Sequence, residues 1–265
     1  MAQAGSGRFG WTGRYTSSVR TAGVDLAADT KKTAIAVIQW ERDRAMVERV
    51  ELGASDEVIV EIAATVDRMG IDCAFGWPDD FVEFVSRHAQ GARVDLSRDR
   101  GIDWRRRLAY RETDREVLRR TGRAPLSVAT DRLGLTAMHC AALLDALADR
   151  IGPIRRGGSG RVVEVYPAAA LRLWELSRPG YKADADVRAA LVVSLEEQAP
   201  WLDLESVRRQ LIESDDAFDA VIAALIARAH ALGETHPVPS TVRERADREG
   251  WIVLPSGTVG ALAVS

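Results

Sequence analysis

The chain has 265 residues, of which 46% are hydrophobic and 28% charged, the composition of a globular protein with a sizeable core. Its 36 Lys and Arg residues against 39 Asp and Glu residues give a formal net charge of -3, which excludes nucleic-acid binding through overall positive charge. No stretch approaches the roughly 18 apolar residues of a membrane span, so we expect no membrane partner. Cys73 and Cys140 have no metal-ligand spacing, and we interpret them as reduced thiols of a cytoplasmic protein.

The N-terminal half predicts strands followed by a helix and a further strand. Residues 1–18 are polar and Gly-rich and are interpreted as a disordered leader, so that a single domain covers residues 19–265. The alternation and spacing of apolar residues predict strands at 22–27, 33–40 and 45–52, a helix at 56–69 that ends at Gly70, and a strand at 71–75. The first two strands, joined by a short polar turn, are expected to form a hairpin.

The sequence then becomes charged and irregular, with a cluster of arginines, and we interpret about residues 79–132 as an Arg-rich insertion on the core. Beyond it, helical spacing predicts helices at 135–151, 168–174, 186–197, 204–212 and 216–231, with strands at 161–166 and 251–254. This order predicts an α/β domain whose mixed sheet has an antiparallel edge hairpin and helices on its faces.

Three predicted strands are interrupted by an acid. Asp25, Asp72 and Glu164 each stand among apolar residues, where an ionised carboxylate must be paired or must hold a metal. For each acid alone, exposure at a sheet edge or a salt bridge to one of the arginines is a sufficient explanation. Three such interruptions together favour a shared site.

Two further acids begin the helix expected at 216–231. Asp216 and Asp219 are three residues apart and therefore share one helix face. Helix capping is the alternative explanation, because acids in the first turn favour the helix dipole. Carboxylates without His or Cys select Mg²⁺ or Mn²⁺, and such ions promote phosphodiester hydrolysis. We therefore predict catalytic roles for Asp25, Asp72, Glu164, Asp216 and Asp219.

The chain also resembles domain-of-unknown-function family 429, whose members are described as predicted nucleases with an RNase H-like fold. Ala74 departs from the proline that this family usually has after the strand acid. The resemblance rests on the order of motifs at residues 22–25, 71–78, 110–114, 121–127, 130–132, 164–167, 181–182, 215–220 and 249–252.

The resemblance implies the RNase H-like superfold, and the order of the acids is similar to that of its RuvC-type branch. By that resemblance Asp25, Asp72, Asp216 and Asp219 would be metal ligands. Part of the Arg-rich insertion could hold substrate phosphate, although a solvated helix face with internal ion pairs explains the arginines equally well. The candidate substrate-binding residues are Arg111, Thr113, Asp114, Arg123, Ser127 and Arg132.

These observations predict a metal-dependent nuclease that acts on nucleic acid, DNA or RNA. Two alternatives stay open. The same fold could serve a nucleotide phosphohydrolase, although no glycine-rich phosphate loop is present. It could also be a non-catalytic module in which the acids bind an ion and the insertion binds a partner.

Overall fold

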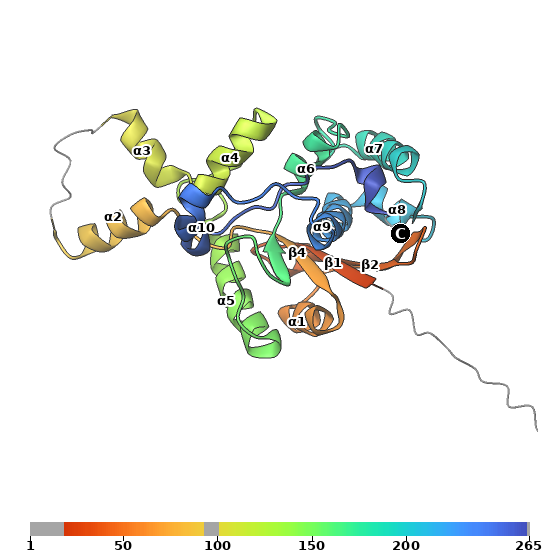
Figure 1. Ribbon diagram of the computed structural model, residues 1–265, viewed down its shortest axis with the longest axis horizontal. Helices are drawn as coiled ribbons and strands as arrows, with labels where there is room; N and C mark the ends of the chain where they lie inside the picture. Colours follow the sequence, from red (N-terminus) through yellow and green to blue (C-terminus); the bar gives the residue numbers. More distant parts are fainter. Residues whose placement is uncertain (1–18, 93–100, 264–265) are drawn as a thin grey trace, which may run out of the picture.

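A mixed sheet forms the centre of the computed structural model, which describes residues 19–92 and 101–263 (Figure 1). The expected leader, residues 1–18, lies outside this range. The strands, in the sheet order β5-β4-β1-β2-β3-β6, pair in parallel except for antiparallel β1-β2-β3. Their bounds are β1 Val19–Asp25, β2 Ala34–Trp40, β3 Ala45–Leu52, β4 Arg68–Asp72, β5 Val162–Glu164 and β6 Leu202–Asp203.

The helices surround this sheet. Their bounds are α1 Asp56–Thr65, α2 Asp79–Ala89, α3 Ile102–Ala109, α4 Glu112–Thr121, α5 Gly134–Ile151, α6 Pro167–Leu173, α7 Ala185–Gln198, α8 Arg208–Glu213, α9 Asp215–Ala231 and α10 Arg243–Glu249. Short 3-10 turns lie at Thr30–Lys32, Ser240–Val242 and Val259–Leu262. None of the described helices combines the length and the apolar character that crossing a membrane requires.

Helices cover both faces of the sheet, as the sequence predicts. On one face, side chains of β1 and β4 such as Val24 and Ile71 pack with Ile59 of α1 and Leu143 of α5. On the other face, β2 and β3 form a core with α6, α7, α8 and α9. The α/β class and the mixed sheet are confirmed. The prediction that the β1-β2 hairpin lies at an edge of the sheet is wrong. Strand β1 lies between β2 and β4, and β3, with β6 beyond it, lies on the other side of β2.

The fourth strand begins earlier than the sequence predicts. Helix α1 ends at Thr65, and Gly70 lies in the middle of β4 instead of ending a helix. The cause is close packing: a Cβ atom at Gly70 would lie 2.7 Å from the backbone oxygen of Ala223 in α9. At Gly23 of β1, a Cβ atom would lie 2.1 Å from the backbone oxygen of Ala220. Both glycines therefore let the backbone of α9 approach the sheet closely.

The segment interpreted as an Arg-rich insertion is mainly helical in its described part. It contains α2, α3 and α4, and α2 and α3 extend away from the sheet (Figure 1). Phe84 of α2 meets the edge of Trp104 of α3, with ring centroids 5.6 Å apart. Trp104 therefore joins these two helices to each other.

Two further predicted strands are shorter than expected. The strand predicted at 161–166 is limited to β5, Val162–Glu164. The strand predicted at 251–254 makes a single bridge, between Ile252 and Glu164. Helix α8 begins at Arg208 instead of residue 204. A period of apolar residues identifies these segments as buried but does not show how many residues find a pairing partner.

Candidate functional site

Two acids lie side by side at the carboxyl ends of β1 and β4. Asp25 and Asp72 are the last residues of these strands, and they are register partners in the parallel pair. Parallel strands end at the same edge of a sheet, which is where α/β proteins place their sites. The parallel pairing of β1 with β4 therefore places Asp25 next to Asp72, although the two residues are far apart in the sequence.

Helix α9 supplies the third acid. Ser214 caps this helix by accepting a hydrogen bond from the backbone nitrogen of Ala217 at 3.1 Å, which fixes where its first turn begins. Helix α9 packs against Gly23 of β1 and Gly70 of β4. The first turns of α9 therefore lie over the carboxyl ends of these two strands. Asp219 is fully buried there. The carboxylate oxygens of Asp25, Asp72 and Asp219 lie within 4.8 Å of one another.

The fourth predicted metal ligand, Asp216, is half-buried one helical turn before Asp219, and Asp25 lies close enough to affect its pKa. Its position in the first turn of α9 is also consistent with favourable interaction with the helix dipole. The structure therefore groups three of the four expected metal ligands, Asp25, Asp72 and Asp219, and places Asp216 beside Asp25.

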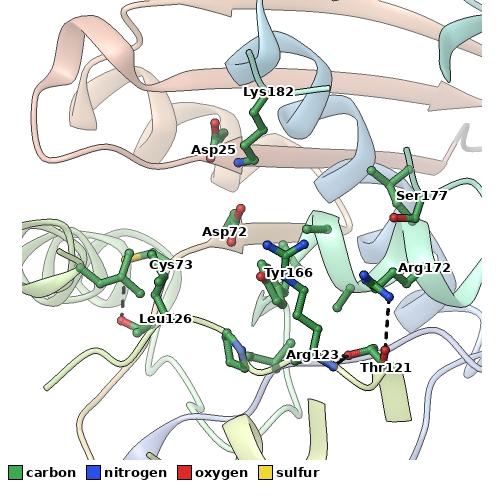
Figure 2. A pocket seen from close by; sticks show the side chains of 18 of the residues that line it. Asp25, Asp72, Cys73, Thr121, Arg123, Leu126, Tyr166, Arg172, Ser177 and Lys182 are labelled. Carbon is green, nitrogen blue, oxygen red and sulfur yellow. Dashed lines mark hydrogen bonds between the residues drawn. The ribbon is translucent and has the colours of Figure 1, made fainter. Parts of the chain in front are cut away.

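Tyr181 and Lys182, to which the sequence analysis gave no role, contact the acids. The Tyr181 hydroxyl donates to Asp219 Oδ1 at 3.0 Å, and Lys182 Nζ lies 2.7 Å from Asp219 Oδ2. Figure 2 shows the Lys182 ammonium group beside Asp25, with Asp72 on its other side. One ammonium group thus faces three carboxylates.

Crowding of the acids alters their protonation. Burial, together with the charges of Asp72 and Asp219, raises the pKa of Asp25 well above its ordinary value. Burial raises the pKa of Asp72 to about 7, although the charge of Lys182 opposes this rise. Burial also raises the pKa of Asp219, against Lys182 and the Tyr181 hydroxyl. The single ammonium group is not enough charge to keep all of these acids ionised at neutral pH.

A divalent cation fits this donor set. Oxygen ligands on opposite sides of one Mg²⁺ ion, with bonds of about 2.1 Å, lie about 4.2 Å apart. The ligand oxygens of the three carboxylates lie within 4.8 Å of one another, an upper limit slightly above this value. The set contains oxygen donors only, which suits Mg²⁺ or Mn²⁺. The residues that could hold such an ion are Asp25, Asp72 and Asp219, with Asp216 beside them.

Glu164 is different, because it is paired with an arginine. Arg111, 3% exposed, donates to both Glu164 oxygens, at 3.0 Å from Nη1 to Oε2 and at 2.8 Å from Nη2 to Oε1. The backbone nitrogen of Phe75 donates to the same carboxylate at 3.0 Å. Arg111 Nη2 also lies 3.0 Å from Asp114 Oδ1. Glu164 therefore lies next to the acids but is neutralised by its own partner.

Three other predicted substrate-binding residues point into the protein. Thr113 accepts a hydrogen bond from the backbone nitrogen of Ile252 at 2.8 Å, and Asp114 accepts one from the backbone nitrogen of Arg111 at 2.9 Å. The hydroxyl of buried Ser127 donates to the backbone oxygen of Ala109 at 2.6 Å. Together with Arg111, these residues hold α4 and the following loop in place.

Arg123 and Arg132, the remaining two, line a cavity of about 650 Å³ that opens beside the acids. Asp25, Asp72 and Lys182 form part of the same wall. Tyr166, Arg172 and Arg178, which the sequence analysis did not single out, also line the cavity. Asp25, Asp72 and the two predicted arginines thus line one pocket.

No curated protein and no solved structure matches the chain. A family model does match, over residues 23–244, which include Asp25, Asp72, Asp219 and most of the pocket. The chain therefore belongs to the DUF429 family, described as proteins of unknown function.

Proposed function

We propose that this protein is a metal-dependent nuclease with an RNase H-like fold, in which Asp25, Asp72 and Asp219 hold Mg²⁺ or Mn²⁺. One observation carries the proposal: carboxylates from β1, β4 and α9, far apart in the sequence, have oxygens within 4.8 Å of one another. Carboxylates grouped at this spacing, with Asp219 fully buried and Asp25 and Asp72 half-buried, are costly unless a cation compensates them. The resemblance to the RuvC-type branch implies the same combination of first-strand, fourth-strand and late-helix acids.

Each residue of the site has a stated task in this proposal. Asp25, Asp72 and Asp219 hold the ion, and Asp216 places a further carboxylate beside Asp25. Tyr181 and Lys182 hold the two oxygens of Asp219 in position. A bound divalent ion would supply an activated water and stabilise the developing charge on the phosphate oxygens.

The chemistry is the addition of one water molecule across a phosphodiester. The water oxygen bonds to phosphorus, the bond from phosphorus to one sugar oxygen breaks, and that oxygen takes up a proton. Arg123 and Arg132 lie in the pocket next to the acids, where guanidinium groups can bind phosphate oxygens in pairs. Glu164 and Arg111 support the pocket wall through their buried ion pair.

A nucleotide phosphohydrolase is the second candidate, and the size of the pocket favours it. About 650 Å³ lies within the range of roughly 300–1,000 Å³ that is typical of pockets for small ligands. Such an enzyme would use the same acids and the same ion on a free nucleotide. Comparing the hydrolysis of nucleic acids with that of nucleoside triphosphates separates the two candidates.

The test uses the full chain, freed of metal, with single- and double-stranded DNA and RNA and with nucleoside triphosphates. We expect Mn²⁺-dependent cleavage of a nucleic acid that falls at least about a hundredfold in Asp25→Asn. Asp145→Asn, an exposed acid of α5, is the matched control and should leave the rate unchanged. Hydrolysis of free nucleotides alone would favour the second candidate. Mn²⁺ binding without any turnover would contradict both and favour a non-catalytic ion-binding module.

A further inference from the structure

The pocket beside the acids is bounded by separate parts of the chain. Its walls come from the segment after α4, the start of α5, helix α6 and the loop that carries Tyr181 and Lys182. Figure 2 shows these segments surrounding the space between Asp72, Arg123 and Arg172. Asp25 and Asp72 therefore line a pocket that has walls on several sides.

Arg123 reaches into this pocket from the segment that follows α4. It follows the left-handed Gly122 that ends α4, and Thr121 Oγ1 accepts from the Arg123 backbone nitrogen at 3.3 Å. Its side chain extends to Tyr166, below Asp72 (Figure 2). Among the described residues, none forms an ion pair or a hydrogen bond with the Arg123 guanidinium group. The backbone is therefore fixed, whereas the donors remain free for a ligand.

The other cations of the pocket differ in availability. Arg172 Nη1 donates to the backbone oxygen of Thr121 at 3.5 Å, and Arg178 Nη2 donates to the hydroxyl of Ser194 at 2.9 Å. Arg132, like Arg123, has no ion pair or hydrogen bond to its guanidinium group from the described part of the chain. Two arginines whose guanidinium donors have no partner among the described residues therefore line the same pocket as Asp25 and Asp72, and guanidinium groups are well suited to bind a phosphate group.

The pocket also offers apolar surface. Pro125, Leu126, Leu133 and Tyr166 line it, and Leu126 is 47% exposed although it is a large apolar residue. A flat nucleobase can pack on an aromatic ring or an apolar side chain without regard to sequence. Phosphate donors next to such a surface match the two parts of a nucleotide.

We propose that this pocket binds the terminal nucleotide of a single nucleic-acid strand, with Arg123 and Arg132 holding its terminal phosphate group. The inference rests on the proposed nuclease function and specifies its substrate. A strand that continues in both directions needs two openings on opposite sides of the acids. A strand end needs one, which suits a pocket bounded on several sides. The scissile phosphodiester would then be the one that joins the bound nucleotide to the rest of the strand.

The test compares four forms of one single-stranded oligonucleotide in Mn²⁺, as DNA and as RNA: 5′-phosphorylated, 3′-phosphorylated, unphosphorylated and closed into a circle. We expect cleavage of one phosphorylated linear form, with release of single nucleotides, and no cleavage of the circle. Arg123→Ala should raise KM for that form about tenfold or more, with little change for the unphosphorylated strand. Arg123→Lys keeps the charge but loses the paired donors, so its KM for that form should lie between those of the unchanged protein and Arg123→Ala. Arg42→Ala, an exposed arginine between β2 and β3, should have no effect.

Several results would overturn the inference. Cleavage of the circle as fast as the linear strands would show that no end is needed. An equal effect of Arg123→Ala on phosphorylated and unphosphorylated strands would remove the phosphate site. If no form is cleaved, the nuclease proposal fails separately, and calorimetry with dithymidine monophosphate carrying a 5′- or 3′-phosphate decides about the pocket. Binding that needs the terminal phosphate and is lost in Arg123→Ala supports the pocket, and the absence of such binding refutes it.

Discussion

The ammonium group of Lys182 lies 2.7 Å from the carboxylate of Asp219, at the position where that acid faces Asp25 and Asp72. Lysine and a divalent cation would therefore share the same carboxylate. The lysine side chain is 53% exposed and can shift to make room for a metal beside Asp219, whereas Asp219 is fully buried.

Replacement of Lys182 by Met should strengthen Mn²⁺ binding and weaken catalysis. A positive charge a few ångströms from the ion opposes its binding by several kcal/mol at an effective dielectric constant of about 20, before screening by solvent at this exposed side chain. We expect roughly a tenfold fall in the Kd for Mn²⁺, measured by calorimetry on the full chain. We also expect a lower kcat, because Asp219 loses one of the two side chains that position its carboxylate. Lys31→Met, which removes an exposed charge from the turn before β2, is the control. Weaker Mn²⁺ binding in Lys182→Met would mean that the lysine supports the ion instead of competing with it.

Without metal, the protein should lose stability as the pH rises. The pKa of Asp72 is raised from 3.8 to about 7 on folding, and that of Asp25 is also raised. A carboxyl whose pKa is raised in the folded state stabilises that state below its unfolded pKa, and this contribution disappears as the pH rises through the folded pKa. The unfolding free energy in EDTA should therefore fall between pH 3.8 and about 7 on account of Asp72.

Urea denaturation at several pH values measures this effect. Asp72→Asn should flatten the fall, because the asparagine side chain does not titrate. Mn²⁺ at about 100 times its Kd should restore about 2.7 kcal/mol at the upper pH. A stability that rises with pH in the absence of metal would show that the acids are compensated by groups other than an ion.

The main elements of the site could be predicted because they follow local patterns. Asp25 and Asp72 interrupt apolar strands, and Asp216 and Asp219 have helical spacing at the start of α9. Parallel pairing of β1 with β4 then brings the strand acids together. Glu164 has the same local pattern as Asp25, yet its partner Arg111 lies 53 residues away in the sequence. A local pattern does not distinguish an acid paired at long range from one left for a metal.

The missed parts of the fold and site also have physical reasons. Tyr181 and Lys182 lie in a loop, where no period marks which side chains turn inward, although their motif is part of the family resemblance. Gly70 was taken as a helix end because glycine is typical of that position. Glycine is needed at position 70 because the α9 backbone near Ala223 approaches it closely, and that segment lies about 150 residues later in the chain.

Replacement of Arg111 by Met should destabilise the protein strongly. It would leave the carboxylates of Glu164 and Asp114, both buried, without their shared cation. Loss of one partner from a buried ion pair costs about 3–5 kcal/mol, which urea denaturation can measure. Arg106→Met, which breaks the exposed pair with Asp103, should cost at most about 1 kcal/mol. A stable Arg111→Met variant with a raised KM would instead give Arg111 the substrate-binding role that the sequence first indicated.

Replacement of Gly23 by Ala should connect packing to metal binding. The added Cβ atom would lie 2.1 Å from the oxygen of Ala220 and 2.2 Å from the nitrogen of Ala224, so α9 must move away from β1. Overpacking of this kind costs about 1–3 kcal/mol. Because Asp219 directly precedes Ala220, the same movement should increase its distance from Asp25 and raise the Kd for Mn²⁺.

Gly134→Ala provides the matched comparison, because a Cβ atom at the start of α5 meets nothing within 4 Å. That variant should be neutral or stabilised by about 0.4–1 kcal/mol, since alanine has less freedom in the unfolded chain. Thermal unfolding and Mn²⁺ titration of both variants separate the two effects. If Gly23→Ala loses stability but keeps its affinity for Mn²⁺, the position of Asp219 does not depend on the contact between α9 and β1, and the ion must be held mainly by Asp25 and Asp72.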